Sequence, residues 1–102
     1  MNDINQIDIN VNGIDRPIDI TINPKELKAY IPSGEKKIDE SIITKLLSIV
    51  CLWNNEYKKN IIDGPIYLVK ITTSKEVVEY KGMGDYPYNF KEFLDLIGKI
   101  YG

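Results

Sequence analysis

The residue types best suited to hold a metal lie near the N-terminus, where Asp8, Asn10, Asn12 and Gly13 are followed by Asp19. Oxygen ligands at alternate positions, a glycine at the sharp turn and an acid at the twelfth position are typical of an EF-hand calcium loop. However, no helical pattern precedes this segment, and a proline stands where the second helix should begin. Strand alternation explains the same residues without a metal, so we predict no cofactor and keep calcium as the alternative.

The side chains needed for most catalytic sites are missing. The chain has no histidine and a single cysteine, Cys51, which lies in an apolar segment typical of a helix. Ser-His, Cys-His and zinc-histidine sites are therefore excluded. Fifteen acids always allow carboxylate pairs, but none of them stands in a recognisable catalytic motif. We predict that the protein is not an enzyme.

A second segment of interest is 82–88, Gly-Met-Gly-Asp-Tyr-Pro-Tyr. It lacks the Lys-Ser/Thr pair of a phosphate-binding P-loop. Met83, Asp85 and Tyr86 are candidate partner-binding residues, because protein interfaces are enriched in Met and Tyr. Tyr88 is expected to pack on Phe93 as a hydrophobic staple. In the alternative, both tyrosines are a platform on which single-stranded nucleic acid stacks.

Charge points to the N-terminal segment as the other candidate surface. The net charge is −2, from 13 basic and 15 acidic residues, which argues against direct nucleic-acid binding. Residues 1–24 nevertheless carry four aspartates against one arginine. A negative surface of this kind attracts a basic partner. The predicted partner-binding residues of this segment are Asp8, Asn10, Asn12, Asp15 and Asp19.

The pattern of apolar residues predicts an N-terminal hairpin and a long helix. Residues 4–22 alternate isoleucine or valine with polar residues on either side of Asn12-Gly13, a strong signal for a two-residue turn. Residues 26–31 are either a third strand or a helical turn after Pro24. A helix is expected from Asp39 to Tyr57, with an apolar stripe at helical spacing. Its members are Ile43, Leu46, Leu47, Val50, Trp53 and Tyr57.

The C-terminal half predicts two strands and a second helix. The strands are expected at 66–72 and 77–81, and the helix starts at Asn89 with Glu92 completing a capping box. The helix's expected buried stripe is Phe90, Phe93, Leu94, Ile97, Ile100 and Tyr101. Together the elements predict one α+β domain over residues 1–102. We expect an antiparallel sheet of four to five strands with two helices packed on one face, in ββ(β)αββα order.

From Trp53 onward the chain resembles a group of small accessory proteins of low-GC Gram-positive bacteria and their phages. The shared outline is carried by Trp53, Asp63-Gly64, Tyr80-Lys-Gly82, Tyr86-Pro87 and Asn89-Phe90. About half of the chain is covered, and the matching residues are structural rather than catalytic. The resemblance implies a small stoichiometric inhibitor, either an anti-defence protein of the anti-CRISPR kind or an immunity protein for a bacterial toxin.

The expected function is therefore non-enzymatic: a protein-binding inhibitor, encoded by a phage or mobile element, that blocks a bacterial defence enzyme. Its partner would be a larger protein with a basic surface, such as a nucleic-acid-processing enzyme. A toxin-immunity role and a single-stranded nucleic-acid-binding module are the alternatives. With no signal peptide and no apolar run of membrane-spanning length, we expect a cytoplasmic location and no membrane contact.

Overall fold

The computed structural model describes residues 3–13, 17–58 and 66–101. They form an α+β fold with two helices and a mixed sheet of seven strands in the order β4-β3-β2-β1-β6-β7-β5. The strands are β1 (Ile4–Asn12), β2 (Ile18–Asn23), β3 (Lys28–Ile31), β4 (Gly34–Lys37), β5 (Glu56–Lys58), β6 (Ile66–Thr73) and β7 (Val77–Met83); the helices are α1 (Glu40–Val50) and α2 (Phe90–Tyr101).

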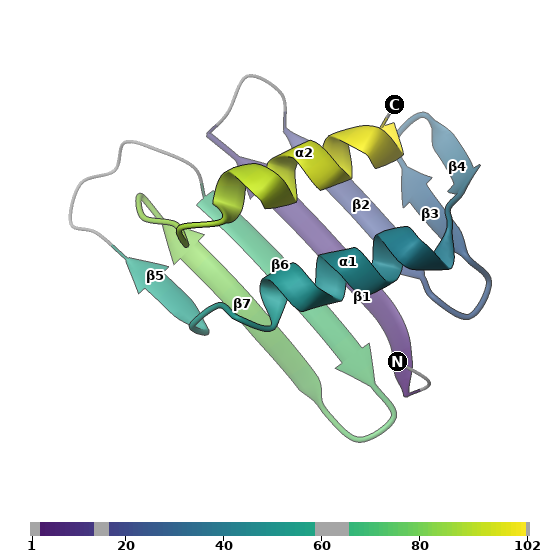
Figure 1. The fold of residues 1–102 in the computed structure, drawn as a ribbon, viewed down its shortest axis with the longest axis horizontal. Coiled ribbons are helices and arrows are strands. Elements are labelled where there is room, and N and C mark those ends of the chain that lie inside the picture. Colours follow the sequence, from purple (N-terminus) through teal and green to yellow (C-terminus); the bar gives the residue numbers. More distant parts are fainter. Residues whose placement is uncertain (1–2, 14–16, 59–65, 102) are drawn as a thin grey trace.

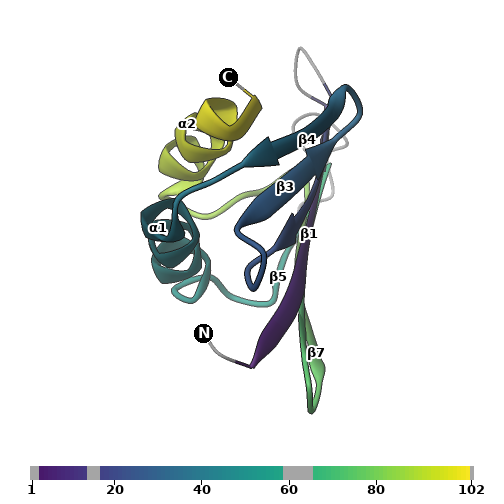
Figure 2. The ribbon, with the colours of Figure 1, turned by 90° about the vertical axis from the view of Figure 1, so that its right-hand side faces the viewer.

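The molecule has two layers. Both helices lie side by side on one face of the sheet, as predicted (Figure 1). Seen from the side, the helices cover only that face and leave the opposite one uncovered (Figure 2). The expected count of four to five strands, all antiparallel, is too low, because β4 and β5 add an edge strand at each end and β5 runs parallel to β7.

The N-terminal hairpin is present, but its predicted two-residue turn at Asn12-Gly13 is wrong. Pairing between β1 and β2 ends at Val11 opposite Ile18, so the connection is longer. This register places Ile9 opposite Ile20, and both side chains are fully buried. A two-residue turn would instead bring the charged residue 16 opposite Ile9 on the core face, so burial decides the register.

Beyond the hairpin, the third strand is confirmed. Residues 24–27 form a turn, and β3 begins at Lys28 rather than continuing a helical turn after Pro24. The fourth strand was not predicted, because Gly34-Glu-Lys-Lys37 has no apolar alternation. It pairs with β3 through its backbone, and an ion pair joins Glu35 to Lys28 at 3.6 Å. An edge strand made of charged residues discourages pairing with other chains.

Helix α1 is shorter than predicted. It begins after Asp39, as expected for the N-cap position, but ends at Val50 instead of Tyr57. The backbone N–H of Trp53 donates to the carbonyl of Val50, closing a tight turn, and Tyr57 lies in β5. Both aromatic residues fitted the helical spacing. They reach the core from a turn and an edge strand instead, so periodicity alone did not fix the end of the helix.

The C-terminal elements follow the prediction closely. Strands β6 and β7 pair antiparallel, and Asn89 directly precedes α2, where its carbonyl accepts the first helical hydrogen bond from Phe93 N–H. The predicted staple between Tyr88 and Phe93 is wrong: Tyr88 is 86% exposed, whereas Phe93 is fully buried. Leu96 is buried in addition to the predicted stripe, while Leu94 is only half-buried.

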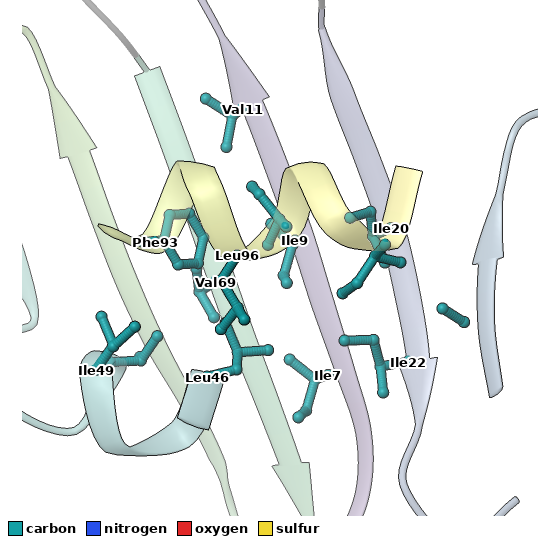
Figure 3. Packing of buried hydrophobic residues seen from close by; sticks show 14 of the residues in the cluster. Ile7, Ile9, Val11, Ile20, Ile22, Leu46, Ile49, Val69, Phe93 and Leu96 are labelled. Atoms are coloured by element: carbon teal, nitrogen blue, oxygen red, sulfur yellow. The ribbon is translucent and has the colours of Figure 1, made fainter. Parts of the chain in front are cut away.

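One apolar core fills the space between the helices and the sheet (Figure 3). Isoleucines from β1 and β2 meet Leu46 of α1 and Phe93 of α2 there. Trp53, only 5% exposed as predicted, packs edge-on against Phe93 and Tyr67, with ring centroids 4.9 and 5.3 Å away. Over the residues that the structure describes, neither helix has the length and apolar character needed to cross a membrane.

Candidate functional site: the open face of the sheet

The uncovered face of the sheet carries most of the predicted partner-binding residues. In β1, Ile7, Ile9 and Val11 are buried under the helices, so the alternate residues Asp8, Asn10 and Asn12 face the other way. In β2, Asp19 alternates in the same manner with the buried Ile20. Asp8, Asn10, Asn12 and Asp19 therefore share one face.

Met83, predicted from a different segment, belongs to the same face. Asn12 pairs with Ile66 of β6, and Ile66 pairs with Met83 of β7, so the three form one row across the sheet. The next row runs from Asp19 through Asn10 and Leu68 to Lys81. We call these two rows the open-face surface: Asn10, Asn12, Asp19, Ile66, Leu68, Lys81 and Met83.

The middle of the open-face surface is apolar. Ile66 and Met83 are 41% and 43% exposed, which is high for residues of these types inside a sheet, and Leu68 beside them is half-buried. Adjacent strands lie about 4.8 Å apart, so these three side chains form one continuous apolar patch. Amides and one carboxylate on β1 and β2 border this patch on one side, and Lys81 borders it on the other.

Asp8 lies one row further along, where its carboxylate is already engaged. Its oxygens accept hydrogen bonds from Gln6 Nε2 at 3.0 Å and from Thr21 Oγ1 at 3.1 Å. Its partner across β6 is Lys70, which in turn pairs with Glu79 on β7. These neighbours hold the carboxylate in place at the border of the open-face surface.

The charge of this face is mixed rather than uniformly negative. Acidic groups dominate on β1 and β2, but Lys70 and Lys81 stand on β6 and β7. Neither lysine was expected on this face from the sequence, because only the strand order brings β6 and β7 beside the N-terminal hairpin. Ile66 and Leu68 were missed as surface residues for a related reason. A strand that is apolar on both faces looks like a fully buried central strand.

Two further predicted residues, Asp85 and Tyr86, lie outside the sheet. Asp15 falls outside the described residues. Asp85 and Tyr86 follow β7 in the loop that crosses to the helix layer, where the backbone N–H of Tyr86 donates to Asp85 Oδ1 at 2.9 Å. The ring of Tyr86 packs at a tilt of 36° against Phe90, with centroids 5.5 Å apart, yet 53% of the residue stays exposed and available to a partner.

The calcium alternative does not fit the backbone. Asp8, Asn10 and Asn12 lie in an extended strand, where alternate side chains are about 6.6 Å apart along the chain. A calcium loop must instead wrap its ligands around one ion at about 2.3–2.6 Å. Among the described residues there is no group of three or more His, Cys, Asp and Glu able to hold a metal.

Comparisons of this chain with protein-family models, with curated proteins and with solved structures found no match.

Proposed function

We propose that this chain is a non-enzymatic protein-binding inhibitor whose open-face surface occupies the surface of a larger, nucleic-acid-processing enzyme. In its most specific form it is an anti-defence protein of the anti-CRISPR kind, as the sequence resemblance implies. The observation that carries the proposal is the placement of Asn10, Asn12, Asp19 and Met83, which come from two distant segments and lie in adjacent rows of one uncovered sheet face.

The composition of that face supports a protein partner. Protein interfaces combine an apolar centre with a polar rim. Here Ile66, Leu68 and Met83 provide the centre, and the amides and carboxylates of β1 and β2 provide a rim on one side. The acidic half of the rim would meet basic residues on the partner, steering association and fixing its orientation.

A phage-defence assay tests the proposal. The chain is expressed in bacteria whose CRISPR system targets a phage, and plaquing efficiency is measured. We expect expression to raise plaquing, and we expect the variant Asp8→Asn, Asp15→Asn, Asp19→Asn to lose most of that effect. The matched control Glu40→Gln, Glu76→Gln, Asp95→Asn removes as much charge from the two helices and the β6–β7 turn, away from the open-face surface, and should keep the effect. Equal plaquing with and without the chain in every system tested would contradict the anti-defence role.

A toxin-protection assay with the same variants distinguishes the toxin-immunity alternative from the anti-defence role. An immunity protein would leave plaquing unchanged but would protect cells that express a toxin from a neighbouring gene. With a purified partner in hand, the affinity of the wild-type chain should fall as salt rises, because the acidic rim is screened. The three-Asn variant should show a shallower dependence on salt than the control.

A second function is favoured by one observation, the 86% exposure of Tyr88, three residues before the exposed Lys91. Bases stack on exposed aromatic side chains with little regard to sequence. A fluorescent single-stranded oligonucleotide in 50 mM salt tests for such a module. Binding that disappears in Tyr86→Ala, Tyr88→Ala would support it, and no binding at this low salt would dismiss it.

A further inference from the structure

A half-open hollow of about 310 Å³ lies at the edge of the sheet, where β6, β7 and β5 run side by side. Its lining is mainly apolar and includes Ile66, Leu68 and Met83 from the open-face surface. Small-molecule sites are typically concave and apolar with a few polar groups, and have volumes of roughly 300–1,000 Å³. The hollow is at the small end of this range, which suits a ligand of few heavy atoms.

Two opposite charges stand next to each other in the wall of the hollow. Glu56 of β5 and Lys81 of β7 are direct partners in the parallel pairing, on strands about 4.8 Å apart. In the part of the chain that the structure describes, neither Glu56 nor Lys81 forms an ion pair with a charged side chain. Both charges are therefore available to a ligand that carries a cationic and an anionic group close together.

Tyr67 of β6 also borders the hollow, but it alternates with Ile66 and Leu68, so its side chain points to the helix-covered face. This side chain is only 2% exposed, and its oxygen has no hydrogen-bond partner among the described residues. Its ring lies across Gly82, where a Cβ would collide with the Tyr67 ring, so glycine is what lets the ring reach this position. The charged groups of the hollow are therefore Glu56 and Lys81, and the Tyr67 hydroxyl is not part of the site.

We propose that this hollow binds a zwitterion with an apolar body, the class to which free hydrophobic α-amino acids belong. The ligand's ammonium group faces Glu56, its carboxylate faces Lys81, and its apolar side chain lies against Leu68 and Met83. The charge pair selects for both charges on one molecule, because a ligand with one of them would leave the opposite protein charge unpaired. This inference does not rest on the proposed inhibitor role, but the hollow shares Ile66, Leu68, Lys81 and Met83 with the open-face surface, so a bound amino acid and a protein partner would compete.

The test is an NMR titration of the isotope-labelled full chain. L-leucine and L-phenylalanine are the ligands, N-acetyl-L-leucine lacks the ammonium group, and L-leucinamide lacks the carboxylate. We expect saturable shifts of the Leu68, Lys81 and Met83 amide signals with both amino acids. Each blocked probe should bind about tenfold more weakly or worse, the loss expected when one charge-assisted hydrogen bond is removed.

Matched variants test which protein charge binds which charged group of the ligand. Glu56→Gln should weaken leucine about tenfold and leave N-acetyl-leucine unchanged, while Lys81→Gln should do the same with leucinamide as the unaffected probe. Glu79→Gln, on the same strand and face but outside the lining, is the control and should bind leucine as the wild type does.

Three results would overturn the proposal. The first is the absence of saturable shifts with both amino acids. The second is equal binding of leucine and its two blocked forms, which would mean an apolar patch without charge recognition. The third is a leucine affinity that is unchanged in both Glu56→Gln and Lys81→Gln. The probe comparison uses only the wild-type chain, so it decides the question even if a variant folds poorly.

Discussion

The indole nitrogen of Trp53 donates a buried hydrogen bond of 2.6 Å to the side-chain oxygen of Asn89. The amide nitrogen of Asn89 in turn donates to the carbonyl of Ile49, at 3.5 Å. One asparagine thus links the last turn of α1, the aromatic residue that follows it and the start of α2. Asn89 is the one buried polar residue found in the described part of the chain, so its partners are unusually important for stability.

Asn89→Ala should therefore destabilise the protein by about 2 kcal/mol, because it leaves the indole N–H and the Ile49 carbonyl without their partner. Urea unfolding followed by tryptophan fluorescence measures the change. The exposed Asn12→Ala is the control and should stay within about 0.5 kcal/mol of the wild type. An Asn89→Ala loss as small as that of the control would show that the link is not structural.

Trp53→Ala should cost about 3–5 kcal/mol, the usual range for removing a large buried aromatic side chain. Trp53→Phe should cost less, because it keeps an aromatic ring among Tyr67 and Phe93 and loses mainly the hydrogen bond. The neighbouring Leu52, which is 63% exposed, provides the control. Circular dichroism in urea can follow all three variants, and a Trp53→Ala cost close to that of Leu52→Ala would refute the burial of the indole.

Three glycines should respond differently to the same change to alanine. Gly82→Ala should cost about 2 kcal/mol or more, because its Cβ would collide with the Tyr67 ring. Gly84→Ala should cost about 1 kcal/mol, because the residue has φ of 73°. Gly98→Ala should gain about 0.5–1 kcal/mol, since it lies in α2 with nothing near its Cβ position. Thermal unfolding ranks the three, and stabilisation by Gly82→Ala would contradict the predicted collision.

Stability should fall in alkaline solution partly because of Tyr67. Burial, reinforced by Tyr57 and Asp85, raises the pKa of its hydroxyl well above the ordinary value of 10.0. The unfolded chain therefore releases this proton first, and the free energy of unfolding decreases as pH rises above about 10. Tyr67→Phe should lose that part of the decrease. Urea unfolding of both proteins at pH 8 and pH 10.5 makes the comparison, and parallel losses would mean that the hydroxyl is not buried in solution.

The elements that were predictable from sequence are those whose pattern is set by burial on one face. The alternation around Ile7, Ile9 and Val11 identified β1 and its inward side, and the apolar spacing from Phe90 identified α2. By contrast, nothing in Gly34-Glu-Lys-Lys37 indicates a strand, because an edge strand of charged residues is held mainly by its backbone hydrogen bonds and lacks apolar alternation.

The end of α1 illustrates a second limit. Trp53 and Tyr57 continue the helical spacing, and only contacts with distant residues show that the chain leaves the helix before them. The bond from Lys81 N–H to the Asn55 carbonyl, at 2.9 Å, begins the parallel pairing of β5. Partners about 25 residues away cannot be inferred from local periodicity.

The candidate site was predictable only in pieces. Residue types pointed to Asp8, Asn10, Asn12 and Asp19 on one segment and to Met83 on another. These residues share one surface only because β6 lies between β1 and β7 in the strand order. The same strand order places Lys70 and Lys81 on this face, so its charge is mixed rather than uniformly negative.

The position of β1 has a consequence for how the chain folds. The first strand of the sequence lies at the centre of the sheet, between β2 and β6. Its pairing with β2 closes a short loop, whereas its pairing with β6 joins residues about sixty positions apart, such as Ile9 and Val69. Contacts at such separation form slowly, because a long stretch of chain must lose its freedom before they are made. The rate-limiting step of folding should therefore be the joining of β1 to β6. Substitutions of residues in the β1–β6 pairing should slow refolding more than substitutions in the β2–β3 turn.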